Sequence, residues 1–536
     1  MLFSSSEFLL YFLPFVFGGF CLLAAYAPPR ANLLWLSLAS LVFYGWWRPE
    51  NLPLLLGSIV FNYWLGGVLL RTPRRAVLVA GIVFNVALLA VFKYTAFVVE
   101  STNDLAGTHW AVPAIVLPLA ISFFTFQQIA YLIDAHDGAV TEHDFGRYVL
   151  FITFFPHLIA GPITHHREML SQFADPNRFR PRLDFVATGA TLFLIGLFKK
   201  VIIADPFGTY VRPIFQAAQV GPVQLVEAWS GAIAYSLQMY FDFSGYSDMA
   251  IGLGLLFGVA LPPNFNSPYK ARNIIEYWAR WHMTLTRFLT AYIYNPIVVA
   301  LTRRRAERGL PLPRRGRMTV PMFVTLLALP TMFTMLVSGV WHGAGWQFVV
   351  FGLLHGTYLV VAHGWRMWKT RRDIPLDSDD PLRVAGSVLL TYLCATVALV
   401  FFRASDVHSA LRVLGGMVGL HGGLLPPPLA KVPFMPALAG MAGFSFGPSR
   451  LIDMMLAVRL VLFLGVVWIL PNAYQWLRNY PTALGLEPKP SWLERFIPAV
   501  TWQPRVATGL VIGAISTFTL LYAVSGAPTE FLYFQF

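Results

Sequence analysis

The chain carries one apolar run after another, each close to the length of a membrane-spanning helix, from its first segment to its last. A helix of roughly 20 residues crosses the hydrocarbon core of a bilayer, which is about 30 Å thick. Only 12% of the 536 residues are charged, against about 25% in an ordinary soluble domain. These features exclude a soluble globular domain. They predict a polytopic membrane protein whose spanning backbone is helical.

Candidate spans follow one another along the whole chain. The run 225–258 is long and contains glycines and aspartates, so it could form two shorter pieces. The stretch 404–452 is rich in Gly, Pro, Ala and Met, and its prolines forbid a continuous helix. It is predicted to be a long loop or a pair of short surface helices. We place the spans near residues 8–27, 33–48, 52–70, 76–99, 110–133, 148–164, 184–204, 225–258, 318–341, 343–363, 383–402, 455–471 and 505–525.

Positive charge gathers in short loops, and the net charge is +13. Loops of this kind normally face the cytoplasm, so the pattern indicates topology and contact with anionic membrane lipids rather than with nucleic acid. If residues 71–75 are cytoplasmic, the three spans before them place the N-terminus outside. The first span has no Lys or Arg before it and is predicted to be a retained helix. The basic groups are "RTPRR" at 71–75, Lys199 with Lys200, "RRRAERGLPLPRRGR" at 303–317 and "RMWKTRRD" at 366–373.

Ionisable residues inside apolar helices are costly and usually face a cavity or a partner. The segment "FDFSGYSDMAIGLGLLFG", residues 241–258, places Asp242, Ser244 and Asp248 in such a helix. Its repeated glycines permit close contact with a neighbouring helix. Two interpretations stay open, a polar cluster that fixes helix packing and a set of residues that line a site.

Two further segments carry histidines among aromatic residues. In "EYWARWHMTLTRFL", residues 276–289, the charges are spaced for an amphipathic helix near the cytoplasmic interface, with Glu276 and Arg280 four residues apart. His282 could point into a cavity. In "FFPHLIAGPITHHREML", residues 154–170, His157, His165 and His166 surround a Gly-Pro break. No metal-binding pattern accompanies them, so a broken or re-entrant helix is preferred and no metal is predicted.

The segment "SGVWHGAGWQFVVFGLLHG", residues 338–356, holds His342 and His355 between glycines at helix-packing spacing. Burial beside Trp341, with no acid adjacent in the sequence, favours a neutral imidazole. A neutral imidazole can act as a general base near pH 7. His355 lies more than three helical turns further on and is predicted to be a cavity-lining or structural residue.

Short motifs are spread along most of the chain: "ISFFTFQQIAYLID" at 121–134, "FFPHLIAGPI" at 154–163, "YFDFSGYSDMAIGLGLLFG" at 240–258, "RWHMTLT" at 280–286 and "GVWHGAGW" at 339–346. In this order they resemble the membrane-bound O-acyltransferase superfamily, and its alginate O-acetyltransferase branch in particular. The resemblance implies an all-α fold of about eleven or more transmembrane helices, with re-entrant or interfacial helices, around a funnelled tunnel. It implies one integral membrane domain over 1–536, with N-terminal helices (1–140), a catalytic core (141–363) and C-terminal helices (364–536).

The resemblance also implies a site and a reaction. His342 and His282 match the family's catalytic histidines. Residues that would line or support the tunnel are Asp242, Ser244, Asp248, Arg280, Trp341 and His355. The implied activity is acyl-CoA-dependent O-acyl transfer, most simply O-acetylation of an exported polysaccharide, with acetyl-CoA as co-substrate and no bound cofactor. A periplasmic esterase-like acetyltransferase of the SGNH type would complete the transfer, and the location would be the bacterial inner membrane.

Several alternatives stay open. The chain reads "RFLTAYIYNPIVVALTRRR" where the alginate branch usually continues differently, so another exported polysaccharide is as good an acceptor. A lipid or a teichoic-acid-like polymer could also be acylated, and a polysaccharide or lipid transporter would use the same buried polar residues as a proton relay. The terminal "FLYFQF", residues 531–536, is either an aromatic interface anchor or a tail whose Tyr533 transiently carries the acyl group.

Overall fold

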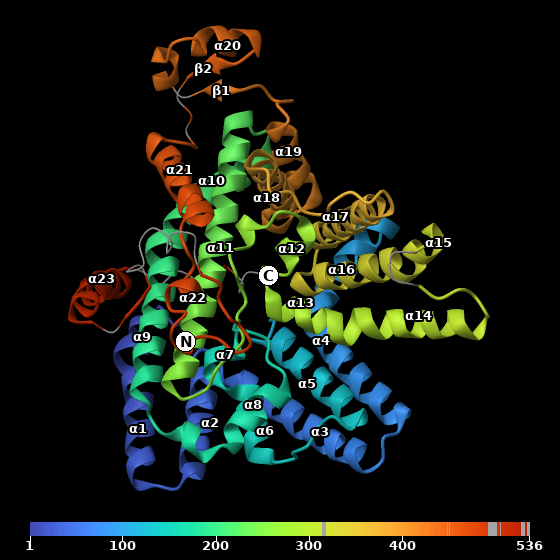
Figure 1. The fold of residues 1–536 in the computed structure, drawn as a ribbon, viewed down its shortest axis with the longest axis vertical. Helices are drawn as coiled ribbons and strands as arrows, with labels where there is room; N and C mark the ends of the chain where they lie inside the picture. Colours follow the sequence, from blue (N-terminus) through green and yellow to red (C-terminus); the bar gives the residue numbers. More distant parts are fainter. Residues whose placement is uncertain are drawn as a thin grey trace. The chain divides into compact units, whose positions relative to one another are not determined.

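The computed structural model describes residues 1–313, 318–425, 427–447, 449, 451–490, 501–503, 505–526 and 531–532. Within these ranges the chain is built almost wholly of helices (Figure 1). The described strands are β1 (Leu424–Leu425) and β2 (Ser445–Phe446), which form one short parallel pair. The all-α architecture predicted from the apolar runs is confirmed.

The chain divides into two compact units, each described here by itself. The first contains Met1–Ile202, Phe243–Asn264 and the described residues from Pro471 on. Within it α2 packs against α1 and α6, α5 packs against α3 and α4, and α9 packs against α23. Its helices are α1 (Leu13–Tyr26), α2 (Pro29–Gly45), α3 (Leu52–Arg71), α4 (Arg75–Ala106), α5 (Ile121–His136), α6 (Phe145–Thr153), α7 (Phe155–Leu158), α8 (His166–Ala174), α9 (Leu183–Phe198), α22 (Ala473–Trp476) and α23 (Val506–Ser525).

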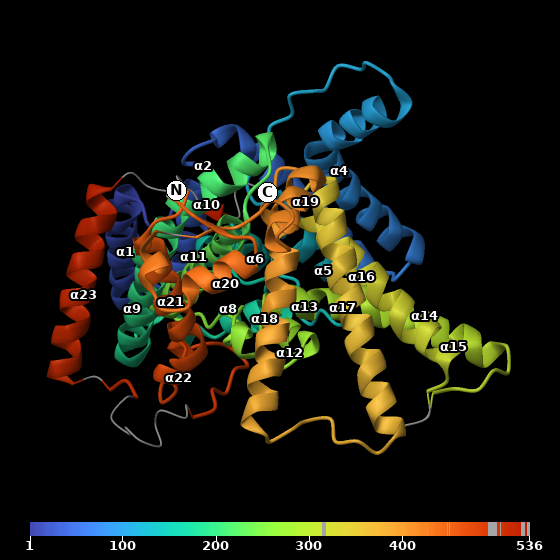
Figure 2. The same cartoon turned by 90° about the horizontal axis from the view of Figure 1, so that it is seen from above.

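The second unit contains Ile203–Asp242 and Phe265–Leu470. Within it α16, α17 and α18 are neighbours in sequence and in space, and α12 packs against both α17 and α18. Figure 2 shows α17 and α18 running side by side and joined at one end by an extended connection. Its helices are α10 (Asp205–Val220), α12 (Ile274–Trp278), α13 (Met283–Leu289), α14 (Asn295–Glu307), α15 (Val320–Phe323), α16 (Leu329–His342), α17 (Trp346–Arg371), α18 (Pro381–Arg403), α19 (Val407–Met417), α20 (Met435–Met441) and α21 (Met454–Ile469).

Eight helices among the described residues are long and apolar enough to cross a membrane. Their outward faces carry exposed Leu, Val, Phe and Trp side chains, which suits contact with lipid rather than with water. A polytopic membrane protein is therefore confirmed. The eight are Glu7–Tyr26, Pro49–Arg71, Arg75–Ala106, Leu183–Val220, Val320–His342, Trp346–Arg371, Pro381–Arg403 and Val506–Ser525.

The segment 225–258 forms one continuous helix, α11 (Leu225–Leu256), so the alternative of two shorter pieces is wrong. The glycines of this helix lie where a neighbouring helix approaches closely. In the first unit, a Cβ atom built on Gly252 would lie 2.5 Å from the carbonyl oxygen of Gly189, and one built on Gly196 would lie 2.4 Å from that of Gly245. The glycines of α11 and α9 therefore let the two backbones approach.

Two predicted spans are shorter than expected. The span predicted over 110–133 begins only at Ile121, because Pro113 and Pro118 keep the preceding residues out of a helix. The span predicted over 148–164 is a broken helix, with α6 ending at Thr153 and the four-residue α7 following it. The broken helix agrees with the prediction, although the break lies at Phe154 and the Gly161-Pro162 pair follows the end of α7.

The stretch 404–452 contains the expected pair of short helices, α19 and α20, with β1 and β2 beside α20. The larger of the two, α19, buries one face against α10 and α18. The prediction that Lys199 and Lys200 lie in a loop is wrong, and the same holds for residues 303–307 and 366–371, which lie in α14 and α17. Both lysines lie in a π-helical segment, Lys199–Ala204, and Lys200 is buried.

The contact between α9 and α11 leads to a stability prediction. Gly252→Val should destabilise the protein by about 1–3 kcal/mol or more, because the new side chain meets backbone atoms that cannot move aside. The measurement is thermal unfolding in detergent. Gly513→Val in α23 is the matched control, since no atom lies within 4 Å of a Cβ built there. Equal stability of the two variants would contradict the packing described here.

Candidate active site

The hairpin of α16 and α17 positions His342. A Cβ atom built on Gly339 would lie 2.3 Å from the carbonyl oxygen of Phe348, and one built on Gly352 would lie 2.4 Å from that of Met335. Only glycine permits so close an approach of two helices. His342 is the last residue of α16. Its imidazole is therefore held at the end of a tightly packed helix pair, and only 6% of the residue is exposed.

His282 lies at the break between α12 and α13. It has a φ of 43° and a ψ of 52°, in the left-handed region. For a residue other than glycine this conformation costs of order 1–3 kcal/mol and is concentrated at functional sites. The side chain is fully buried, and burial lowers the pKa of His282 to about 3. The imidazole is therefore neutral at pH 7.

The two histidines lie side by side in the second unit, with 6.3 Å between their ring centroids. The indole of Trp341 lies near both, 5.0 Å from the ring of His342 and 6.2 Å from that of His282. Phe402 of α18 contacts His342 edge-on at 5.1 Å, and Phe351 of α17 does so at 5.9 Å. Two imidazoles thus share an apolar enclosure built from α13, α16, α17 and α18.

His355 is held apart from His342 by the ring of Phe351, which lies 4.7 Å from the imidazole of His355. The indole Nε1 of Trp278 donates a hydrogen bond of 3.2 Å to Nδ1 of His355, and Tyr277 stacks on the imidazole at 6.2 Å. His355 therefore ties α12 to α17, and in doing so it supports the segment that leads to His282.

Arg280 forms an ion pair with Glu276 across one turn, as the four-residue spacing predicts. The single amphipathic helix expected over 276–289 is absent, because α12 ends at Trp278 and α13 begins only at Met283. The left-handed backbone at His282 interrupts it. This break is what turns the imidazole out of the helical path and into the enclosure.

The polar residues of α11 separate into different surroundings. Asp248 accepts a hydrogen bond of 2.6 Å from Nζ of Lys199 and one of 2.9 Å from the hydroxyl of Tyr474. All three residues belong to the first unit. Asp248 therefore fixes helix packing, which is the first of the two interpretations of this segment. Ser244 is buried in the same unit, and Asp242 is buried in the second.

The three histidines around residues 154–170 have separate partners in the first unit. The amide Nε2 of Gln127 lies 3.4 Å from Nδ1 of His157, His165 caps α8, and Nδ1 of His166 lies 3.1 Å from a carboxylate oxygen of Asp134. Across the described residues, no group of three or more His, Cys, Asp or Glu side chains is placed to hold a metal.

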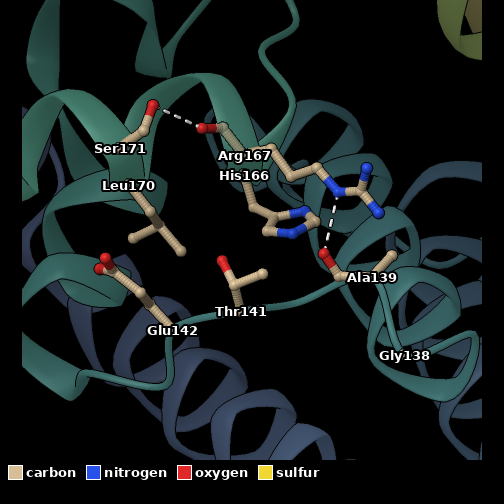
Figure 3. A pocket seen from close by; sticks show the side chains of 8 residues that line it. All are labelled: Gly138, Ala139, Thr141, Glu142, His166, Arg167, Leu170 and Ser171. Carbon is tan, nitrogen blue, oxygen red and sulfur yellow. Dashed lines mark hydrogen bonds between the residues drawn. The ribbon is translucent and has the colours of Figure 1, made fainter.

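His166 also lines a cavity of about 280 Å³ in the first unit. Figure 3 shows its imidazole beside Thr141, with the guanidinium of Arg167 turned to the carbonyl oxygen of Ala139, to which Nε donates a hydrogen bond of 2.9 Å. The side chain of Ser171 donates to the carbonyl oxygen of Arg167 at 2.8 Å. This hollow holds none of the site residues predicted from the sequence.

Phe351 and Phe402 complete the enclosure of His342, and the sequence reasoning missed both. Phe402 lies near the end of α18, 60 residues after His342, and no local motif marks it. The helical spacing from Phe351 to His355 could have shown that both rings share one face of α17.

Comparison with known proteins agrees with this architecture. The model of the MBOAT, membrane-bound O-acyltransferase family matches residues 138–307, a stretch that includes His282. The chain is 42% identical to the peptidoglycan O-acetyltransferase of Helicobacter pylori, over 79% of this chain and 80% of the relative. The chain therefore belongs to the membrane-bound O-acyltransferase family, and it is a membrane O-acyltransferase.

Two further relatives show which other acyltransferases the chain is similar to. The chain is 33% identical to the probable alginate O-acetylase AlgI of Pseudomonas aeruginosa, over the full length of both proteins. It is 28% identical to the teichoic acid D-alanyltransferase of Bacillus subtilis, over 47% of this chain and 60% of that protein. The resemblance to the alginate O-acetylase branch is confirmed.

The hydrogen bond between Trp278 and His355 can be tested by substitution. His355→Phe keeps the ring but removes the acceptor, so a buried indole N–H loses its partner at a cost of about 1–3 kcal/mol. His355→Gln keeps an acceptor and should lose less. Thermal unfolding in detergent, followed by tryptophan fluorescence, measures the difference. Equal stability of the two variants would show that the hydrogen bond contributes nothing.

Proposed function

We propose that this chain transfers an acetyl group from a thioester such as acetyl-CoA to a hydroxyl group on the outer side of the membrane, for O-acetylation of an exported polysaccharide, with His342 as general base. The observation that carries the proposal is the pair of buried imidazoles, 6.3 Å apart, inside an aromatic enclosure. An alcohol is a poor nucleophile until a base removes its proton, and a neutral imidazole can remove it at pH 7.

The reaction assigns one role to each histidine. His342 takes the proton of the attacking hydroxyl as its oxygen bonds to the acyl carbon, and returns that proton to the leaving thiolate when the carbon–sulfur bond breaks. His282 orients the thioester or, where its ring N–H faces the acyl oxygen, stabilises the oxyanion. The rings of Phe351, Phe402 and Trp341 keep water from the acyl group.

The acceptor is inferred from the relatives. One is named a peptidoglycan O-acetyltransferase and another a probable alginate O-acetylase, so we propose a cell-envelope polysaccharide. The donor enters from the cytoplasm and the acceptor lies on the other side of the inner membrane. The N-terminus lies outside, and a periplasmic SGNH-type partner passes the acetyl group to the polymer.

Substitution of His342 tests the reaction. The His342→Gln variant should lose at least about 100-fold in rate, because Gln fills the space but cannot act as a base. Purified protein in detergent is incubated with labelled acetyl-CoA, and thiol release and the label on the protein or on an added hydroxyl acceptor are measured. His109→Gln, at an exposed histidine of the first unit, is the control and should keep its turnover. Equal turnover in the His342 variant would overturn the assignment of the base.

The C-terminal tail provides a second test. Phe531 lies in the first unit, 4.5 Å from the ring of Tyr246 and 6.0 Å from that of Phe243. Tyr533 falls outside the described residues, and its role as a transient acyl carrier stays a prediction. Tyr533→Phe keeps an aromatic anchor and removes the hydroxyl that would accept the acetyl group, so acetylation of the polymer in cells should be lost while the amount of protein in the membrane stays at the wild-type level. Unchanged acetylation would reject the carrier role.

A further inference from the structure

A cleft of about 860 Å³ opens in the second unit where the end of α17, the start of α18 and residues 272–275 meet. The residues of the connection between α17 and α18 also line it, and Figure 2 shows this connection at the end of the helix pair. A volume of this order suits a small amphipathic molecule. None of the predicted catalytic residues lines the cleft.

The cleft is basic at one end. Arg366 and Lys369 lie in the last turns of α17, Arg383 lies in the first turn of α18, and Arg272 precedes α12. Lys369 is engaged by the protein, since its Nζ donates to the carbonyl oxygens of Pro375 and Leu376 at 3.2 and 3.4 Å. It fixes the connection between the helices. Arg366 is exposed, and the side chain of Arg383 is 79% exposed, with Nε 3.4 Å from a carboxylate oxygen of Asp380.

The cleft is apolar at the other end. Ala362, one turn before Arg366, and Leu390, two turns after Arg383, line it within the spans themselves. Leu390 is 63% exposed and Trp365 is 56% exposed. On membrane-spanning helices such faces lie against lipid, and an exposed tryptophan beside basic residues is typical of the membrane interface. The cleft therefore opens sideways toward the bilayer as well as toward water.

We propose that this cleft binds one anionic phospholipid, with its phosphate at Arg366 and Arg383 and an acyl chain along Ala362 and Leu390. Basic pockets between spanning helices on the cytoplasmic side are suited to such headgroups. Asp377 and Asp379 line the same mouth. These carboxylates accept hydrogen bonds from the hydroxyl groups of a glycerol headgroup and disfavour a headgroup that carries phosphate alone.

The change from cationic to apolar lining along one helix pair favours a lipid over a soluble phosphate compound. A lipid carries its charged phosphate and its hydrocarbon in the same order relative to the bilayer. A soluble anion, including the phosphates of a thioester donor, would satisfy the arginines but leave the apolar part of the cleft against water. The two sources share the phosphate chemistry, and a competition experiment distinguishes them.

The experiment measures lipid binding to the purified full chain in detergent by native mass spectrometry. Phosphatidylglycerol is added alone, against phosphatidylcholine with the same acyl chains, and together with an excess of coenzyme A. Arg366→Gln/Arg383→Gln should bind phosphatidylglycerol at least about tenfold more weakly, because both cations that contact the phosphate are removed. Arg304→Gln/Arg308→Gln removes the same charge from exposed residues of and beside α14 and should leave binding unchanged.

Two more variants separate the parts of the cleft. Arg366→Lys/Arg383→Lys keeps the charge and should retain binding, so a folding defect of the glutamine variant would be recognised. Ala362→Trp fills the apolar end and should weaken lipid binding without removing a charge. Equal binding of the two lipids, equal loss in the control variant, or displacement of phosphatidylglycerol by coenzyme A would overturn the proposal. The thiol release that depends on His342 is measured in a separate assay. A negative result for one proposal therefore does not affect the other.

Discussion

Close approach of helix backbones at glycine is the interaction on which the rest of the structure depends. Between helices in lipid the hydrophobic effect offers little, because the surrounding chains are as apolar as leucine, and association relies on van der Waals packing. Gly339 and Gly352 bring α16 against α17 at backbone distance. His342 ends α16 directly after this contact, so its position is set by rigid backbone rather than by a mobile loop.

His282 is placed in the enclosure by a break in a helix rather than by a helix contact. His282 interrupts a helical path instead of ending a packed one, and its left-handed backbone turns the imidazole inward. A regular helix over 276–289 would have carried this side chain on the same face as its neighbours three and four residues away. The left-handed backbone of one residue therefore places its imidazole beside that of His342, and burial keeps the imidazole of His282 neutral.

The apolar runs of the sequence predicted the helices well, but they predicted poorly which side chains contact one another. The apolar runs located most spans, and the glycines correctly indicated helix contact, because both signals are local. The prediction erred in two places: it extended the span at 110–133 across Pro113 and Pro118, which end the helix locally, and it left open a break in α11, whose continuity depends on its packing. The histidine motifs pointed to His282 and His342, but Phe402 comes from a distant helix and has no local signal.

Cations in this chain have different roles according to the partners that the fold offers them. Lys199 is paired with Asp248 inside the first unit, so its charge is neutralised by protein and it serves packing. Arg366 stands at the end of a span beside an apolar cleft. A buried cation without a partner would be too costly to retain, whereas an interfacial one remains available for an anion. The sequence alone predicts that both residues are basic loop positions, and only their surroundings distinguish a cation paired inside the protein from an exposed one.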